Sequence, residues 1–189
     1  RRVFPELHAR CPAIRLECIS AGTQGVCRLL NQNEADLMYT LDSHIYDTNF
    51  SILQESRISM HFVCPADHPL AGRDHITAEE LVKQPFLLTE KGMSYRRLMD
   101  EQLAAKSLEV KPVFVSGNAD LICYLVEKGV GFSLMPDYVT RPYVEKGTLR
   151  YVNVPEIKLE VWTQLLHHRD KWISEPMRIV IDYLHRCVL

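Results

Sequence analysis

Hydroxyl, amide and glycine residues lie in two short turns, each between a predicted strand and a predicted helix. The first turn holds Gly92, Met93 and Ser94, and the second is the segment 116–118, in which Asn118 is also expected to cap the helix that follows. In open α/β sheets, small ligands bind beyond the carboxyl ends of the strands, where the first N–H groups of each helix point outward. The two turns therefore predict noncovalent binding of a small polar molecule.

Two further segments follow predicted strands and complete the candidate site. They are residues 40–43, at the end of the strand predicted at 35–41, and residues 135–138, at the end of the strand predicted at 131–135. The candidate ligand-binding residues are Thr40, Leu41, Asp42, Ser43, Gly92, Met93, Ser94, Ser116, Gly117, Asn118, Met135, Pro136 and Tyr138. Within this set, Asp42 either accepts a hydrogen bond from a ligand amine or only stabilises its own loop.

The polar residues that open the helix after the first turn each have two interpretations. The Ser94 hydroxyl either donates to a ligand carboxylate or only caps its own helix. Arg96 and Arg97 are cations in the first helical turn, where they oppose the helix dipole, and a bound anion would remove that cost. The alternative is that they pair with Asp100 and Glu101, four positions further on, along a solvated face.

No grouping of side chains predicts catalysis, a cofactor or a metal ion. The eight histidines include the neighbours His167 and His168, which point to opposite sides of a strand and cannot share one ion. The sequence contains no HExxH zinc motif, no G-x-S-x-G nucleophile turn, no phosphate-binding Walker loop and no dinucleotide fingerprint. We therefore predict that the chain is not an enzyme and that it binds its ligand without a cofactor or a metal.

The six cysteines form no CxxC pair and no zinc-finger spacing. Most lie within apolar patterns: Cys18 alternates with Ile14 and Leu16 on one strand face, and Cys123 occupies a core position of a helix. Reduced, buried thiols are the favoured interpretation, and a thiol-based redox switch is the alternative.

The elements that must position these residues alternate between strand and helix. Strands are predicted at 14–20, 35–41, 50–55, 59–63, 86–89, 112–116, 131–135, 149–154 and 159–167, and helices at 3–10, 22–32, 94–106, 118–128 and 136–145. A capping box at 77–80 opens one more short helix, and Ser174 caps the last helix. This alternation predicts βαβ units, a sheet rich in parallel strands and helices on both of its faces.

One pattern occurs twice. Residues 20–38 and residues 116–135 each contain a small polar turn, a helix and a strand that ends near a methionine. Two similar subdomains would explain the repetition, although generic βαβ units can also resemble one another by chance.

Charge and hydropathy exclude two classes of protein. The formal net charge is −2, and no stretch is strongly basic, so the chain is not expected to bind DNA by itself. No apolar run approaches the ~20 residues that span a bilayer. Residues 1–10 lack the apolar segment of a secretory signal.

The segment 125–136, LVEKGVGFSLMP, carries the most informative motif. Gly129 should end a helix in a left-handed turn, Gly131 should let the backbone pass closely, and Pro136 should stop a strand and start a helix. This segment resembles the "lV..G.G...lP" signature of the effector-binding domain of LysR-type transcriptional regulators. Further similar pieces occur in the expected order at 4–5, 11–16, 34–37, 68–71 (HPLA) and 145–149.

The resemblance implies a fold of two Rossmann-like subdomains linked by two crossover strands, similar to type II periplasmic binding proteins. Residues 1–60 plus 163–189 would form effector-binding subdomain I, and residues 61–162 would form effector-binding subdomain II. The ligand would lie between them, at the same turns that the strand geometry selects. The first strand of subdomain I should precede Arg1, and its absence would leave a gap in the sheet.

The resemblance also implies a function and partners. A small metabolite, with anions among the candidates, would bind and modulate transcription in the cytoplasm. DNA would be bound only through an N-terminal winged helix-turn-helix that this chain does not contain. A homodimer would form through the helices 22–32 and 118–128, or alternatively through other helices of the subdomains, with a higher oligomer possible in the full-length protein. The alternatives are a solute-binding protein of a transporter, and an enzyme built on the same fold.

Overall fold

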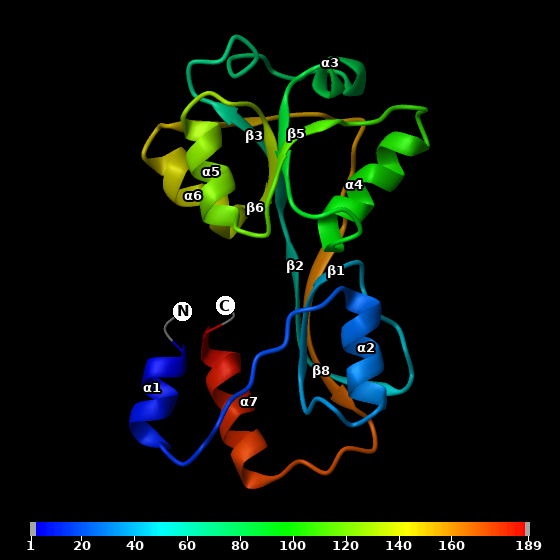
Figure 1. The fold of residues 1–189 in the computed structure, drawn as a ribbon, viewed down its shortest axis with the longest axis vertical. Helices are drawn as coiled ribbons and strands as arrows, with labels where there is room; N and C mark the ends of the chain where they lie inside the picture. Colours follow the sequence, from blue (N-terminus) through cyan, green and yellow to red (C-terminus); the bar gives the residue numbers. More distant parts are fainter. Residues whose placement is uncertain (1–2, 188–189) are drawn as a thin grey trace. The chain divides into compact units, whose positions relative to one another are not determined.

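The chain folds into two compact units (Figure 1). The computed structural model describes residues 3–187, and the side chains of residues 4–186. The first unit contains the residues up to Thr40, Ile45–Glu55 and the residues from Gln164 on, and the second contains Leu41–His44 and Ser56–Thr163. The predicted division into 1–60 plus 163–189 and 61–162 stays a prediction, and its outermost positions lie outside the described residues.

Within the described residues, the first unit contains a three-stranded sheet and three helices. The strand order is β1 (Met38–Asp42), β8 (Val161–His168) and β2 (Phe50–Ile58), and both β2 and β8 continue into the second unit. Helix α2 (Thr23–Asn31) packs on this sheet through Leu30, which is buried with Met38 and Phe50. Helices α1 (Val3–Arg10) and α7 (Glu175–Cys187) form a second small core that includes Leu7 and Val180.

The segment 14–20 is not the strand that its alternating pattern predicts. It has no regular secondary structure, and Leu16, Cys18 and Ile19 are exposed. Alternation alone does not make a strand, because the backbone N–H and C=O groups need a neighbouring strand, and none of the described residues supplies one. The nearly continuous apolar run at 35–41 predicts a strand that is buried throughout, and this is also wrong, since the strand begins at Met38 and Tyr39 is exposed.

The second unit is built around β3 (Met60–Pro65), which is antiparallel to both of its neighbours. These are β6 (Ser133–Pro136) and β7 (Leu149–Val152). Strands β4 (Phe86–Leu88) and β5 (Pro112–Val115) are parallel to each other, and a parallel bridge from Phe86 to Phe132 links β4 to the start of β6. The predicted βαβ units are therefore present, but the predicted predominance of parallel strands is wrong, because β3 runs against its neighbours.

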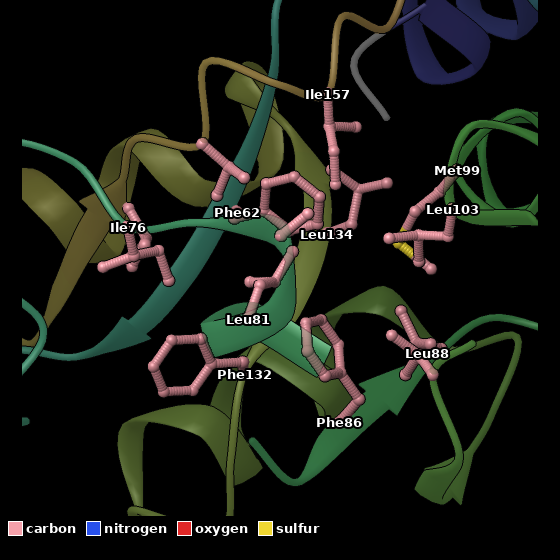
Figure 2. Packing of buried hydrophobic residues seen from close by; sticks show 14 of the residues in the cluster. Phe62, Ile76, Leu81, Phe86, Leu88, Met99, Leu103, Phe132, Leu134 and Ile157 are labelled. Carbon is pink, nitrogen blue, oxygen red and sulfur yellow. The ribbon is translucent and has the colours of Figure 1, made fainter. Parts of the chain in front are cut away.

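Helices cover both faces of the strands of the second unit, as predicted (Figure 1). Helices α3 (Ala78–Val82) and α4 (Ser94–Ala104) pack on one face through a large apolar core. Figure 2 shows two members of this core, Phe62 and Leu134, side by side. They are paired residues of the neighbouring strands β3 and β6. Helices α5 (Ala119–Glu127) and α6 (Asp137–Glu145) pack on the other face.

The buried cysteines of the second unit are inert thiols. Burial raises the pKa of Cys64 and of Cys123 to about 11 each, so both stay protonated near neutral pH. This agrees with the favoured interpretation for these two residues, whereas Cys18, expected on a buried strand face, is exposed.

Local sequence signals set the geometry around β4 and β6. Thr77 and Glu80 form the predicted capping box, and Gly129 ends α5 with a φ of 81°. A Cβ atom built on Gly131 would lie 2.9 Å from the carbonyl carbon of Pro85 and closer still to its oxygen. The backbone of Phe132 donates to that same oxygen at 2.8 Å, so only glycine allows the approach.

The substitution Gly131→Ala tests this approach directly. We expect a loss of about 2 kcal/mol or more in the free energy of unfolding, because the methyl group would push β4 away from β6. Chemical denaturation measures the loss. The control is Gly72→Ala, at an exposed glycine with nothing within 4 Å of an added Cβ atom, and it should change stability by less than about 0.5 kcal/mol. Equal effects of the two substitutions would contradict the explanation.

Candidate functional site

The turn before α4 leaves a hydroxyl without a local role. Gly92 adopts a φ of 84°, Met93 is the N-cap residue, and no side chain caps the helix. The interpretation that Ser94 caps its own helix is therefore wrong. Its φ of 24° is unusual for a residue other than glycine, and its hydroxyl has no hydrogen-bond partner among residues 3–187. The hydroxyl is thus available to a ligand.

The turn before α5 is held by its own side chains. Asn118 Oδ1 accepts from the backbone N–H of Leu121 at 3.1 Å, which confirms the predicted cap. Ser116 Oγ accepts from the backbone N–H of Asn118 at 3.1 Å. These bonds fix the conformation of the turn but occupy the side-chain oxygens of both residues.

The two predicted turns are neighbours in the second unit. Strands β4 and β5 run side by side, and the backbone N–H of Ser116 donates to the Leu88 carbonyl at 3.1 Å just beyond them. Further on, a Cβ atom built on Gly117 would lie 2.8 Å from Glu90 Oε1, so the Glu90 side chain lies close to this exposed glycine. Glu90 was not among the predicted site residues, although it lies only two positions before Gly92.

The residues that follow β6 differ in their accessibility. Met135 is fully buried, and its sulfur accepts a hydrogen bond from the Tyr95 hydroxyl at 3.6 Å. Pro136 is also buried, whereas Tyr138 is exposed. Burial, as its largest cause, raises the pKa of Tyr95 to about 12, so the hydroxyl stays protonated. Tyr95 thus links the first turn of α4 to β6, a role that the sequence pattern did not reveal.

The end of β1 is joined to α4 by a buried carboxylate. Leu41, Asp42 and Ser43 belong to the second unit by their contacts, whereas Thr40 lies in the first unit, buried, with its hydroxyl 3.5 Å from the Gln164 carbonyl. Asp42 is 3% exposed, and its Oδ1 accepts from the backbone N–H of Ser43 at 2.7 Å. The same oxygen also accepts from a guanidinium of α4.

That guanidinium belongs to Arg97, whose Nη2 lies 2.8 Å from Asp42 Oδ1 and whose Nη1 lies 2.6 Å from Glu101 Oε1. The hydrogen bond that Arg97 donates to Glu101 raises the pKa of Arg97 above its ordinary value, and the charge of Asp42 adds to this in spite of burial. The predicted pair with Glu101 is therefore confirmed. The partner Asp42, 55 positions away, was not predicted.

Arg96 forms the other predicted pair, and its Nε lies 2.8 Å from Asp100 Oδ2. The expectation of a solvated face is wrong for this residue, since its side chain is only 6% exposed. Its Nη1 also donates to the Thr89 carbonyl at 3.4 Å, so it braces the end of β4 against α4.

A further ionic cluster lies where β3, β7 and α6 meet. Asp137 Oδ1 accepts from the Tyr151 hydroxyl at 3.1 Å and lies 3.5 Å from His61 Nε2, and Oδ2 accepts from Arg141. Burial raises the pKa of Asp137, but the hydrogen bonds from Arg141 and Tyr151 outweigh it and the net shift is downward. Burial lowers the pKa of His61. Every charged group in the cluster has a partner. The cluster therefore stabilises the start of α6.

Two further features, a metal-binding cluster and a membrane-spanning helix, are absent from the described residues. No group of three or more His, Cys, Asp or Glu side chains among the described residues could hold a metal ion. In the part of the chain that the structure describes, none of the helices combines the length and the apolarity that crossing a bilayer requires.

We predict that the Asp42–Arg97 ion pair contributes to the stability of the fold. We expect Arg97→Met to lower the free energy of unfolding by about 2 kcal/mol, because it removes the ion pair that the Arg97 guanidinium forms with the buried Asp42 carboxylate. Glu101→Gln is the matched control, and it should cost less than about 0.5 kcal/mol because Glu101 is 58% exposed. Urea denaturation compares the two variants, and a larger loss for Glu101→Gln would contradict this assignment of the main partner.

Comparison with known proteins identifies the class to which this fold and these turns belong. The family model "LysR substrate binding domain" matches residues 1–187, so the chain belongs to that family, the effector-binding domains of LysR-type transcriptional regulators. The resemblance that the segment 125–136 carries is thereby confirmed, and the alternative of a transporter's solute-binding protein gains no support.

The relatives are transcriptional regulators. The chain is 28% identical over 154 residues to the HTH-type transcriptional regulator YwqM of Bacillus subtilis, an alignment that covers 81% of this chain and 52% of YwqM. The chain thus spans about half the length of this relative.

Solved structures of regulatory domains share the fold. The CcmR regulatory domain of Synechocystis PCC6803 in complex with 2-PG has a TM-score of 0.76 and 19% identity, with 98% of this chain and 88% of that chain covered. The effector-binding domain of QuiR in complex with shikimate has a TM-score of 0.69 and 18% identity, with 98% and 90% covered. The predicted architecture, similar to type II periplasmic binding proteins, is confirmed.

Proposed function

We propose that this chain senses a small anionic metabolite within a cytoplasmic LysR-type regulator and performs no catalysis. The observation that carries the proposal is the unpartnered Ser94 hydroxyl at the head of α4, next to the turn 116–118. A hydroxyl and free helix N–H groups suit an acceptor such as a carboxylate. The absence of a nucleophile with a neighbouring base among the candidate residues supports binding without turnover.

The other parts of the proposal concern the whole regulator. Residues 1–60 plus 163–189 and residues 61–162 would serve as the two effector-binding subdomains, with the ligand between them. DNA would be contacted by a winged helix-turn-helix upstream of Arg1, since this chain's net charge of −2 gives it no electrostatic footprint for DNA. That YwqM is named an HTH-type regulator supports this division of labour.

An anionic ligand would compete with Asp42. In the structure the Asp42 carboxylate accepts from Nη2 of Arg97, three residues beyond Ser94 on the same helix. A ligand carboxylate bound at Ser94 would offer Arg97 a second acceptor and weaken its hold on residues 41–44. The ligand would shift the conformation only to the extent that it binds one arrangement better than the other. Shikimate, which QuiR binds, is a carboxylate and suits this site chemically.

The proposal predicts which ligands bind and where. In a thermal-shift panel of carboxylates and phosphates that includes shikimate and 2-PG, we expect at least one anion to raise the unfolding temperature. A ligand at a hundred times its Kd stabilises by about 2.7 kcal/mol. Ser94→Ala should weaken the binding of that anion about tenfold, because a hydrogen bond to a charged acceptor is lost.

Ser20→Ala is the control, at an exposed serine of the first unit, and it should leave the affinity unchanged. Recovery of the ligand unaltered after incubation, followed by mass spectrometry, checks the absence of turnover. An affinity that Ser94→Ala leaves untouched would contradict the site, and conversion of the ligand would contradict the sensor.

Of the two helices predicted to form the homodimer, α2 and α5, only α5 lies beside an exposed apolar surface that supports the prediction. Strand β5 ends its sheet, and Val113 on it is 61% exposed. The neighbouring helix α5 adds Tyr124, which is 50% exposed, together with Leu121. An unpaired strand edge beside exposed apolar side chains is typical of an interface. The apolar side chains of α2, in contrast, pack inside the first unit.

We therefore expect Tyr124→Glu to shift the dimer toward monomer by placing a charge in an apolar contact. Sedimentation velocity measures the shift, which should raise the dimer Kd at least about tenfold. Tyr46→Glu, at a residue that is 83% exposed in the first unit, serves as the control and should leave the Kd unchanged. A dimer that withstands Tyr124→Glu would rule out α5 as the interface.

A further inference from the structure

The first unit displays a tryptophan at the rim of a cavity. Trp172 is 81% exposed and lies in the loop between β8 and α7. The cavity has a volume of about 440 Å³ and is lined by Trp172, Asp170, Lys171 and His168 together with the C-terminal end of α2. A tryptophan side chain offers a large apolar contact area, so one that is exposed at the rim of a cavity provides a surface on which a ligand can stack.

The loop that carries Trp172 is held in place by its neighbour. Lys171 Nζ lies 2.6 Å from Asn33 Oδ1 and 2.6 Å from Asp36 Oδ1. Its backbone N–H donates to the His168 carbonyl at 2.9 Å. The ammonium group of Lys171 is therefore neutralised by Asp36, and its backbone fixes the position from which Trp172 projects.

The remaining charge at the cavity is negative. Asp170 has an exposed carboxylate with no partner among residues 3–187, while its backbone N–H donates to His168 Nδ1 at 3.2 Å. That bond assigns the ring proton of a neutral His168 to Nε2. Asp170, Asp36 and Lys171 together carry a net charge of −1, and the C-terminal end of the α2 dipole adds further negative potential.

We propose that this cavity binds a small organic cation, which stacks on the Trp172 ring and pairs with the Asp170 carboxylate. The face of an indole attracts cations, and tryptophan is the best of the aromatic residues for this contact. The lining residues all lie in the first unit, whereas Ser94 and the turn 116–118 lie in the second. The proposal therefore does not rest on the anion site and would survive its failure.

The two tryptophans of the sequence make the test direct. Trp162→Phe leaves Trp172 as the sole indole, so its fluorescence reports on the cavity. We expect benzylamine, a cation at neutral pH, to quench this emission with a saturable curve. Benzyl alcohol, of the same size and neutral, should bind about fivefold more weakly, and benzoate more weakly still. Free N-acetyltryptophanamide corrects for collisional quenching.

Asp170→Asn in the Trp162→Phe background separates the two contacts. It should weaken benzylamine binding about threefold and leave benzyl alcohol binding unchanged. Asp182→Asn, at another exposed aspartate of the first unit, should change neither affinity. Quenching that stays linear and equals that of the free indole, or equal affinities for the amine and the alcohol, would overturn the proposal. A threefold loss with Asp182→Asn would attribute the preference to overall charge and also overturn it.

Discussion

The close approach of Gly131 to Pro85 is the constraint on which the second unit depends. The Phe132 N–H donates to the Pro85 carbonyl and the Leu87 N–H donates to the Phe132 carbonyl, each at 2.8 Å, and this pair of bonds sets β4 beside β6. Strand β5 then aligns on β4, so that both strands end at the same edge. The turns that begin α4 and α5 are neighbours only because this register holds. The missing side chain of Gly131 thereby positions the polar groups of the turns 92–94 and 116–118, which are distant from it in sequence.

Charge organises the same region in a second way. Arg96 and Arg97 are adjacent in sequence but have different surroundings, because the first is buried against the end of β4 and the second reaches Asp42. Two cations in the first turn of a helix oppose its dipole. Here each cation has an acidic partner one helical turn later, and Arg97 has Asp42 in addition. The positive charges at the start of α4 are thus paired with acidic side chains when no ligand is bound. A bound anion would compete with those side chains for the guanidinium groups.

Local patterns predicted much of this from the sequence, since their causes lie within a few residues. The capping box at Thr77, the cap at Asn118 and the left-handed turn at Gly129 each depend on near neighbours. Contacts between distant segments were not predictable: nothing near Asp42 in sequence indicates Arg97. The segment 14–20 shows the opposite failure, because its alternation satisfied a local rule while the pairing that a strand needs was missing.

The five cysteines with described side chains differ widely in their surroundings. Cys64 and Cys123 are sealed in separate cores of the second unit, with pKa values near 11, and such thiols supply almost no thiolate at physiological pH. Cys18, in contrast, stands in water within the irregular segment 14–20 of the first unit. Alkylating reagents would thus reach that segment long before they reach either core, which makes Cys18 a natural attachment point for a spectroscopic probe.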